Sequence, residues 1–240
     1  MDAWWFIALV ALVAFLYSMV GHGGASGYLA LMAIVGVGSA TARPTALVLN
    51  CFVSTIAFVQ FARAGHFSWK VFWPFALLSI PMAWLGSRIE LDPLVYKRVL
   101  AACLLVAVAR MLGVFGKTEV SLRQVPVATA LLIGAALGLV SGMIGIGGGI
   151  LLSPVLLLLG WADTRTTACV SALFILVNSL SGLAGLSMTG LPPLQWNWLV
   201  AALAGGALGS WIGAEKLQAV RLRQALGLVL LFASIKLVLP

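Results

Sequence analysis

Acidic side chains are scarce in this sequence, and charges of either sign are few. Its 240 residues include six Asp or Glu, and charged residues make up 8% of the chain, whereas a soluble domain carries about 25%. Hydrophobic residues make up 62%. So few charges exclude a water-exposed surface of ordinary composition. We therefore predict an all-α polytopic membrane protein without a separate soluble domain.

The positions of the six acids exclude several kinds of transporter. All lie in loops or at the ends of predicted apolar segments: Asp2, Glu90, Asp92, Glu119, Asp163 and Glu215. Proton relays and cation sites usually place Asp or Glu inside the helix bundle. A cation pump or a carboxylate-based metal transporter is therefore disfavoured, and neutral groups or histidine must handle the substrate.

Motifs for catalysis, metals and nucleic acids are also missing. The sequence shows no metal-ligand cluster, nucleophile triad or phosphate-loop lysine, so we predict no enzyme, no metal site and no cofactor. No basic stripe is interleaved with stacking aromatics, which argues against a nucleic-acid partner. The net charge of +8 instead indicates contact with the lipid bilayer and a preferred orientation in it.

Cysteine is rare as well. Cys51, Cys103 and Cys169 form an odd set in apolar context, which argues against a disulfide framework. Cys103 is expected to be structural. Cys51 and Cys169 are either small hydrophobes or, if the substrate carries reactive sulfur, groups for sulfur exchange.

Glycine, in contrast to charged residues and cysteine, is frequent within the apolar segments. Four glycines fall within the five positions 145–149, and each costs about 1 kcal/mol relative to alanine inside a helix. We expect a helix break there, at membrane depth, where irregular backbone must be buried by protein or line a watery cavity. Tight helix packing is the alternative explanation of these glycines.

The break has a counterpart 124 positions earlier, which predicts an internal duplication. Gly21 matches Gly145, Gly23 matches Gly147 and Gly24 matches Gly148. With small gaps the match continues through five further pairs: Ser54 with Ser179, Gly65 with Gly190, Trp69 with Trp196, Gly86 with Gly213, and Arg98 with Arg223. We predict a first transmembrane repeat at 1–115, a polar linker at 116–124 and a second repeat at 125–240.

Each repeat is predicted to contain four long helices and one short glycine-broken segment, since a span needs about 20 apolar residues. The first repeat has segments 3–20, 24–37, 44–62, 71–89 and 98–115. The second has segments 125–143, 148–160, 166–188, 196–214 and 222–239. The short segments are 24–37 and 148–160.

The relation between the repeats depends on whether the short segments cross the membrane or re-enter. Crossing makes the repeats inverted, whereas re-entry makes them parallel. Cytoplasmic loops collect Lys and Arg; the inverted arrangement places nine of the 14 such residues on one side, and the parallel arrangement places eight. We predict inverted repeats, with both termini outside and the linker in the cytoplasm.

The starts of the two short segments are the predicted substrate site. Helix N-termini carry partial positive charge and free N–H donors, so they attract anions. Two such ends meeting near the midplane would hold an anion without a buried Lys or Arg. We expect the backbone amides near Gly23, Gly24, Gly147 and Gly148 to bind it, with one repeat rocking against the other for alternating access.

Polar side chains in the apolar helices would complete this site. His22 is the only ionisable residue expected deep in the bundle; it either contacts substrate or couples a proton, or it is a hydrogen-bonded neutral imidazole in the packing. The other intramembrane polar residues either join helices or line a path: Asn50, Ser54, Thr55, Ser171, Asn178, Ser179 and Ser181. The repeat favours Ser54, Asn178 and Ser179 for the path.

Two further sets of glycines have a packing explanation. Glycines recur every fourth residue at positions 134, 138 and 142, and again at positions 205, 209 and 213. Small residues at this spacing let two helices approach closely.

These features together resemble one known family. The glycine-rich stretch 142–149 with Pro154 after it, the weaker copy at 21–27, and the polar stretch 171–181 leading to Gly190 and Trp196 resemble the sulfite exporter TauE/SafE family of membrane transporters. The resemblance covers essentially the whole chain. It implies a multi-pass protein of a bacterial or archaeal inner membrane that moves small anions, of which sulfite or an organosulfonate is expected here.

The first copy departs from the family's pattern by carrying His22, Ala25 and Ser26, which leaves open whether the two halves contribute equally. Two rival functions remain: a non-transporting scaffold or assembly factor, and a passive small-anion channel. The scaffold gives no reason for duplicated glycine breaks. A homo-oligomer is compatible with all three functions.

Overall fold

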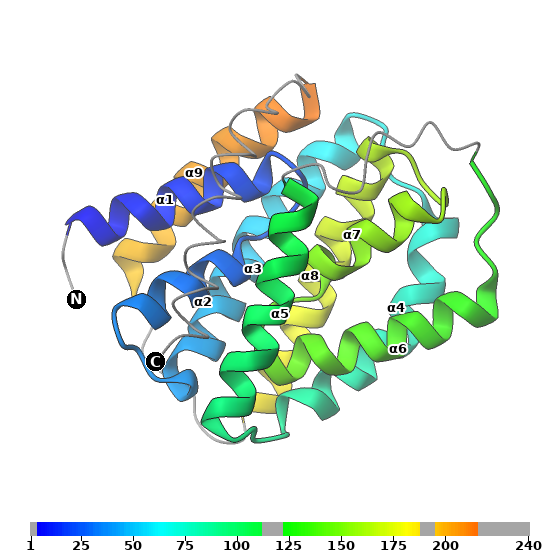
Figure 1. Ribbon diagram of the computed structural model, residues 1–240. Coiled ribbons are helices and arrows are strands. Elements are labelled where there is room, and N and C mark those ends of the chain that lie inside the picture. Colours follow the sequence, from blue (N-terminus) through cyan, green and yellow to red (C-terminus); the bar gives the residue numbers. More distant parts are fainter. Residues whose placement is uncertain (1–3, 112–121, 188–194, 216–240) are drawn as a thin grey trace.

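The computed structural model of this chain describes residues 4–111, 122–187 and 195–215, and every regular element in that part is a helix (Figure 1). The described helices are α1 (Trp4–Ser18), α2 (Ala25–Ile34), α3 (Ser39–Arg63), α4 (Trp69–Ser87), α5 (Pro93–Met111), α6 (Val127–Ile144), α7 (Gly149–Leu158), α8 (Thr164–Leu186) and α9 (Trp196–Glu215). The predicted all-α fold is thus confirmed.

The helix boundaries agree with the predicted segments to within a few residues, with two exceptions. Helix α3 begins at Ser39 rather than at 44, and α5 begins at Pro93 rather than at 98. Pro44 was expected to open α3, but it lies in the second helical turn, where its missing N–H removes one backbone hydrogen bond. The predicted final span at 222–239 and most of the 116–124 linker lie outside the described residues.

The helices have the character of membrane spans. Within the described ranges, α3, α6 and α8 are long and apolar enough to cross a membrane, and α1, α2 and α7 are shorter apolar helices. Large apolar side chains such as Leu132, Leu180 and Val200 are more than half exposed. In water such a surface would be a liability, whereas lipid tails accommodate it.

Glycines bring α4 and α6 into direct backbone contact. A Cβ atom built on Gly138 would lie against the carbonyl oxygen of Ser79, and one on Gly142 against that of Ala83. Because the contacts advance in the same direction along both helices, α4 and α6 run parallel. The predicted role of this glycine set in close packing is confirmed.

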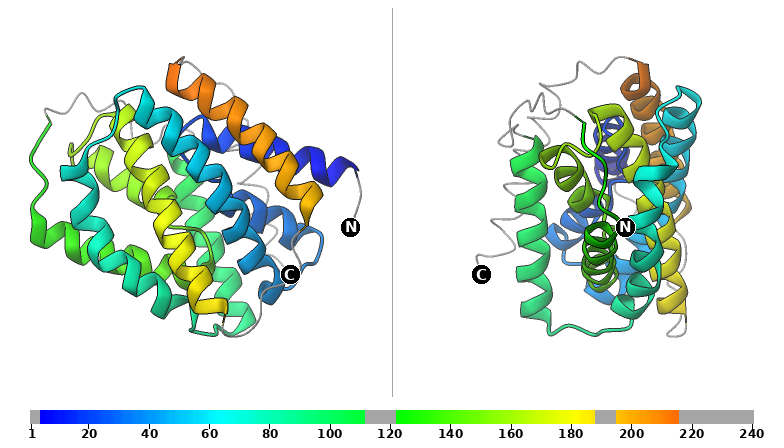
Figure 2. Two further views of the ribbon diagram at one scale, coloured as in Figure 1. Left: turned by 180° about the vertical axis from the view of Figure 1, so that it is seen from behind. Right: turned by 90° about the vertical axis from the view of Figure 1, so that its right-hand side faces the viewer.

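Helices α1 and α9 form a second pair of the same kind (Figure 2). Here Gly209 lies against the Phe15 carbonyl group and Gly213 against that of Met19. Under the predicted duplication α1 corresponds to α6 and α9 to α4, so the two pairs are equivalents of each other.

Helices α3 and α8 lie side by side in the middle of the molecule, and they run antiparallel (Figure 2). Leu47 lies against Gly182, and Asn50 of the next turn of α3 donates a hydrogen bond to Ser179, one turn earlier on α8. The equivalent helices of a parallel repeat would run the same way. The relation between the repeats stays a prediction, and this antiparallel course supports the inverted arrangement.

The short helices α2 and α7 start beside the middles of α3 and α8. Each has 10 residues, or about 15 Å, which is half the roughly 30 Å of a bilayer core. The N–H of Ala25 donates to Asn50 in the middle of α3, and Gly149 lies against Ile175 in the middle of α8. Both glycine breaks therefore lie at mid-depth of the two central helices, as predicted.

An aspartate determines where α8 begins. The Asp163 carboxylate accepts hydrogen bonds from the N–H groups of Arg165 and Thr166 and from the Thr166 hydroxyl. Partial burial raises its pKa, but these hydrogen bonds outweigh burial and hold the pKa of Asp163 below its ordinary value. Such a cap stabilises a helix by about 1 kcal/mol.

The contact between α4 and α6 yields a prediction about stability. Gly138→Ala forces a methyl group onto the Ser79 backbone, and overpacking of this kind costs about 1–3 kcal/mol. Gly182→Ala is the matched control, because its methyl group would meet only side-chain atoms, of which the nearest belongs to Leu47, at 3.3 Å. We expect thermal unfolding in detergent to show a lower melting temperature for Gly138→Ala. A melting temperature equal to that of the control would contradict the close contact.

Candidate functional site

Left-handed glycines produce the two breaks. Gly24 has a φ of 97° and precedes α2, and Gly148 has a φ of 77° and precedes α7. Residues that carry a side chain rarely adopt this backbone conformation, whereas glycine tolerates it. Neither helix start has a side-chain hydrogen bond from its capping residue, so the first-turn amides lack the usual internal acceptor.

Four amide groups at these starts have no hydrogen-bond partner. Within the described residues, no hydrogen bond uses the N–H of Gly23, Gly24, Gly147 or Gly148, although all four residues are buried. Buried backbone donors without a partner are rare. These N–H groups are therefore available to an acceptor from outside the protein.

Asn50 joins the two breaks. Its Oδ1 atom accepts from the Ala25 N–H at 3.1 Å, and its Nδ2 atom donates to the Ile146 carbonyl oxygen at 3.3 Å and to Ser179 Oγ at 3.2 Å. The side chain is fully buried. A Cβ atom on Gly147 would lie 2.6 Å from Asn50 Nδ2. One amide side chain thus ties the start of α2, the second glycine break and α8 together.

His22 links the first break to the start of α7. Its Nδ1 lies 2.9 Å from the Val20 carbonyl oxygen, so in this pairing Nδ1 carries a proton and donates. Its Nε2 lies 3.1 Å from Ser153 Oγ and 3.3 Å from the Gly149 carbonyl oxygen. The neutral ring accepts from Ser153, and a second proton could be donated to Gly149. His22 is thus a hydrogen-bonded group within the packing, and its surroundings accommodate either protonation state.

The remaining predicted side chains differ in how they relate to this cluster. Ser54 donates to the Asn50 carbonyl oxygen at 2.6 Å, and Ser179 accepts from the Asn50 side chain. Asn178 donates to the Phe174 carbonyl oxygen of its own helix at 2.8 Å, and its Oδ1 is buried without a partner in the described part of the chain. The structure thus gathers Ser54 and Ser179 around Asn50, whereas Asn178 bonds within α8.

Sequence reasoning listed Asn50 among the polar residues but did not assign it to the site. The reason is that the repeat was used to choose among them, and the position that matches Asn50 is Ile175. Ile175 packs against Gly149, at the place in the second half where Asn50 of the first half accepts a hydrogen bond from Ala25. Ser171 is likewise among those polar residues without being assigned to the site, and Ser153, whose hydroxyl group lies 2.7 Å from that of Ser171, was not singled out. The two halves therefore do not contribute equally to the cluster.

The cavity between the breaks is small. It has a volume of about 10 Å³, and its lining includes His22, Gly23, Gly24, Asn50 and Ile175. That is about the space of one water molecule. The described form therefore holds the two helix starts against each other, and a larger ligand could enter only after they separate.

Comparison with known sequences places the chain in a family. The sequence model of the family described as Sulfite exporter TauE/SafE matches residues 6–237. The chain belongs to this family. It is also 39% identical over 232 residues to a protein of Sinorhizobium fredii named probable membrane transporter protein y4hK, covering 94% of each chain. No solved structure matches the chain.

Membership in the TauE/SafE family establishes the class of the protein. The matched family and the matched relative are membrane transporters, and the apolar helices are those of a membrane protein. The protein is therefore a membrane transporter. The family resemblance expected from the glycine motif and from the polar stretch 171–181 is confirmed.

The central position of Asn50 yields a second prediction. Asn50→Ala leaves the Ala25 N–H and the Ile146 carbonyl group without their partner, and each unpaired buried group costs about 1–3 kcal/mol. Ser54→Ala is the control, because Ser54 bonds only carbonyl groups of its own helix. We expect Asn50→Ala to lower the melting temperature in detergent clearly more than Ser54→Ala does. Equal melting temperatures would show that Asn50 does not join the breaks.

Proposed function

We propose that this TauE/SafE transporter exports a small oxyanion, sulfite or an organosulfonate, across the inner membrane by alternating access. The observation that carries the proposal is the set of four buried, unpartnered amides at Gly23, Gly24, Gly147 and Gly148. An oxyanion offers several acceptor atoms to such donors. The bound anion would lie between the starts of α2 and α7.

The magnitudes favour an anion at this place. Each helix start carries about half a positive charge, so two starts together match one negative charge. Hydrogen bonds to a charged group contribute about 1.5–3 kcal/mol each, and several are needed to offset the several kcal/mol that desolvation of an ion costs. A site of amides without a fixed cation can meet that cost and still release the anion.

The small volume of the cavity between the breaks supports a carrier over a passive channel. A passive channel needs a continuous path, whereas the space between the breaks measures about 10 Å³. A carrier passes through a closed form of this kind while one repeat moves relative to the other. The scaffold alternative has little support once the chain is placed in a transporter family.

His22 supplies a titratable group beside the anion. Its ring nitrogens face the Val20 and Gly149 carbonyl oxygens, so an imidazolium would find acceptors for both protons. A positive ring next to the amides would attract the anion. We include proton coupling through His22 in the proposed mechanism.

The amide site predicts a transport defect for one glycine variant. In Gly147→Ala the added methyl group would lie against Asn50 and Ser179, at a residue with a φ of 73°. We expect the initial rate of labelled sulfite counterflow in proteoliposomes to fall about tenfold, which corresponds to about 1.4 kcal/mol.

The matched control for this variant is Gly65→Ala. Gly65 has a similar φ of 81° but no atom within 4 Å of an added methyl group, so it shares the backbone strain without touching the site. It should keep most of the counterflow. If both variants lose transport equally, strain alone explains the loss and the amide site is wrong.

His22 yields a further prediction. Sulfite that binds only the folded form should raise the melting temperature of purified protein by mass action. We expect His22→Ala to reduce that rise, because the ring nearest the amides is removed. Ser153→Ala, which removes a hydrogen-bond partner of the ring and of Ser171 but keeps the imidazole, should largely retain it. An undiminished rise in His22→Ala would exclude His22 from the site.

A further inference from the structure

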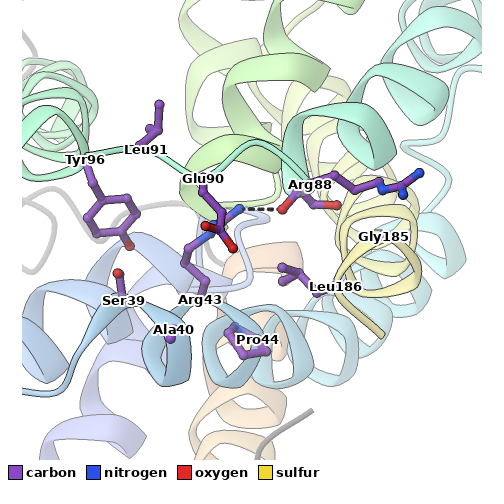
Figure 3. A pocket seen from close by; sticks show the side chains of 11 residues that line it. Ser39, Ala40, Arg43, Pro44, Arg88, Glu90, Leu91, Tyr96, Gly185 and Leu186 are labelled. Atoms are coloured by element: carbon purple, nitrogen blue, oxygen red, sulfur yellow. Dashed lines mark hydrogen bonds between the residues drawn. The ribbon is translucent and has the colours of Figure 1, made fainter. Parts of the chain in front are cut away.

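A second and much larger cavity lies where α3 and α5 begin and where α4 and α8 end. Its volume is about 590 Å³, within the roughly 300–1,000 Å³ of small-molecule sites. Figure 3 shows its polar lining, to which the start of α3, the α4–α5 connection and α5 contribute Ser39, Arg43, Arg88, Glu90 and Tyr96.

Arg43 is a buried arginine whose donors are only partly used. The side chain is 8% exposed. Its Nη2 donates to the carbonyl oxygens of Ser87 and Gly142, both at 3.0 Å. Its Nε is buried without a partner, and no hydrogen bond of the described residues uses Nη1. Buried cations are almost always paired, so the unused donors indicate an acceptor from outside the protein.

A purely structural role explains the two hydrogen bonds of Arg43 Nη2 but not its other donors. By bonding the Ser87 and Gly142 carbonyl groups, Arg43 holds the end of α4 against the end of α6. Nη2 alone does this. The structural role does not account for Nε and Nη1, or for an open cavity of this size around a guanidinium.

The cavity and the predicted anion site lie at two levels of one face of α3. Arg43, Leu47, Asn50 and Ser54 recur at helical spacing on that face, and Arg43 lies about 10 Å from Asn50 along the axis. Arg43 also lies against Gly145 of the second break, where an added Cβ atom would be 3.2 Å away. Leu47, which is fully buried, separates the two spaces.

The charges around the cavity favour an anion but include a competitor. Arg43 and Arg88 line it together with one acid, Glu90. The Arg88 guanidinium lies 4.6 Å from the centre of the Trp84 ring, and the Tyr96 hydroxyl donates to the Ile144 carbonyl oxygen at 3.3 Å. Two cations outweigh the single carboxylate, which opposes the binding of a second negative charge.

We propose that this cavity is an anion-binding vestibule in which the unused donors of Arg43 hold a free small oxyanion on its way to or from the glycine breaks. This inference rests on the proposed transport function. It adds a second anion site, which opens on one particular side of the membrane. This side, the cavity's face, is the one where α3 begins and α4 ends, which the predicted inverted arrangement places outside the cell.

The test is sulfite binding by calorimetry to purified protein in phosphatidylcholine nanodiscs. Arg43→Gln removes the donors and should weaken one class of sites about tenfold, the loss expected for a charge-assisted hydrogen bond. Glu90→Gln removes the competing charge and should tighten the same class about threefold. Glu90→Gln leaves the Arg43 hydrogen bonds to Ser87 and Gly142 intact, so it tests the vestibule even if Arg43→Gln fails to fold.

Sided uptake distinguishes the vestibule from a structural role. In oriented proteoliposomes Arg43→Gln should raise the KM for sulfite added at the cavity's face about tenfold and change the KM at the other face less than twofold. Equal changes at both faces, or sulfite dissociation constants unchanged in both variants, would overturn the vestibule.

The two proposals fail in different ways. Binding that depends on Arg43 and Glu90 without any sulfite transport would refute the sulfite transport function while supporting the anion site at Arg43. Transport that is indifferent to both variants would refute the vestibule alone. A lipid phosphate group could bind Arg43 in the same way as the free oxyanion, so the binding measurement is repeated in nanodiscs that contain phosphatidylglycerol. If these lipids abolish sulfite binding at the Arg43-dependent site, a lipid headgroup occupies the cavity, and the assignment of the cavity to a free oxyanion is overturned.

Discussion

Four buried amide groups without acceptors are the constraint on which the rest of this structure depends. A helix in a membrane normally satisfies its own backbone, and each orphaned donor costs about 1–3 kcal/mol. In the described part of the chain nothing accepts a hydrogen bond from the N–H groups of Gly23, Gly24, Gly147 and Gly148. Asn50, His22 and Ser153 lie around them and bond neighbouring groups. Half-length helices bring these amides to mid-depth, where an anion would satisfy them.

The packing around these breaks provides both rigidity and a place for movement. Glycine contacts join α4 to α6 and α1 to α9 backbone to backbone, so each pair has few ways to deform. The contacts between the two breaks are hydrogen bonds of Asn50 and His22 instead. Hydrogen bonds can exchange one partner for another at a modest net cost, whereas interlocked backbones cannot. Motion of one pair relative to the other, as alternating access requires, is therefore easiest at the breaks.

Much of this arrangement was predictable from the sequence, because glycine clusters indicate where a helix breaks and the scarcity of charge indicates which segments lie in the membrane. The breaks at Gly24 and Gly148, the glycine contacts and the short helices follow from residue type and spacing. Two features did not. Asn50 has no polar match in the other half, so the repeat directed attention to Ser54 and Ser179. Arg43 precedes the predicted segment 44–62 by one residue, and its burial depends on α3 beginning at Ser39. Both depend on contacts between distant segments, which no local pattern encodes.

The most direct test of the central claim is a structure of the wild-type protein with selenite in place of sulfite, the selenium being located by its anomalous scattering. The account predicts a selenium peak between the starts of α2 and α7, with selenite oxygens within hydrogen-bonding distance of the Gly24 and Gly148 N–H groups. The helix starts should be further apart than in the closed form described here. A protein that transports sulfite but shows no selenium peak at the breaks would contradict the account.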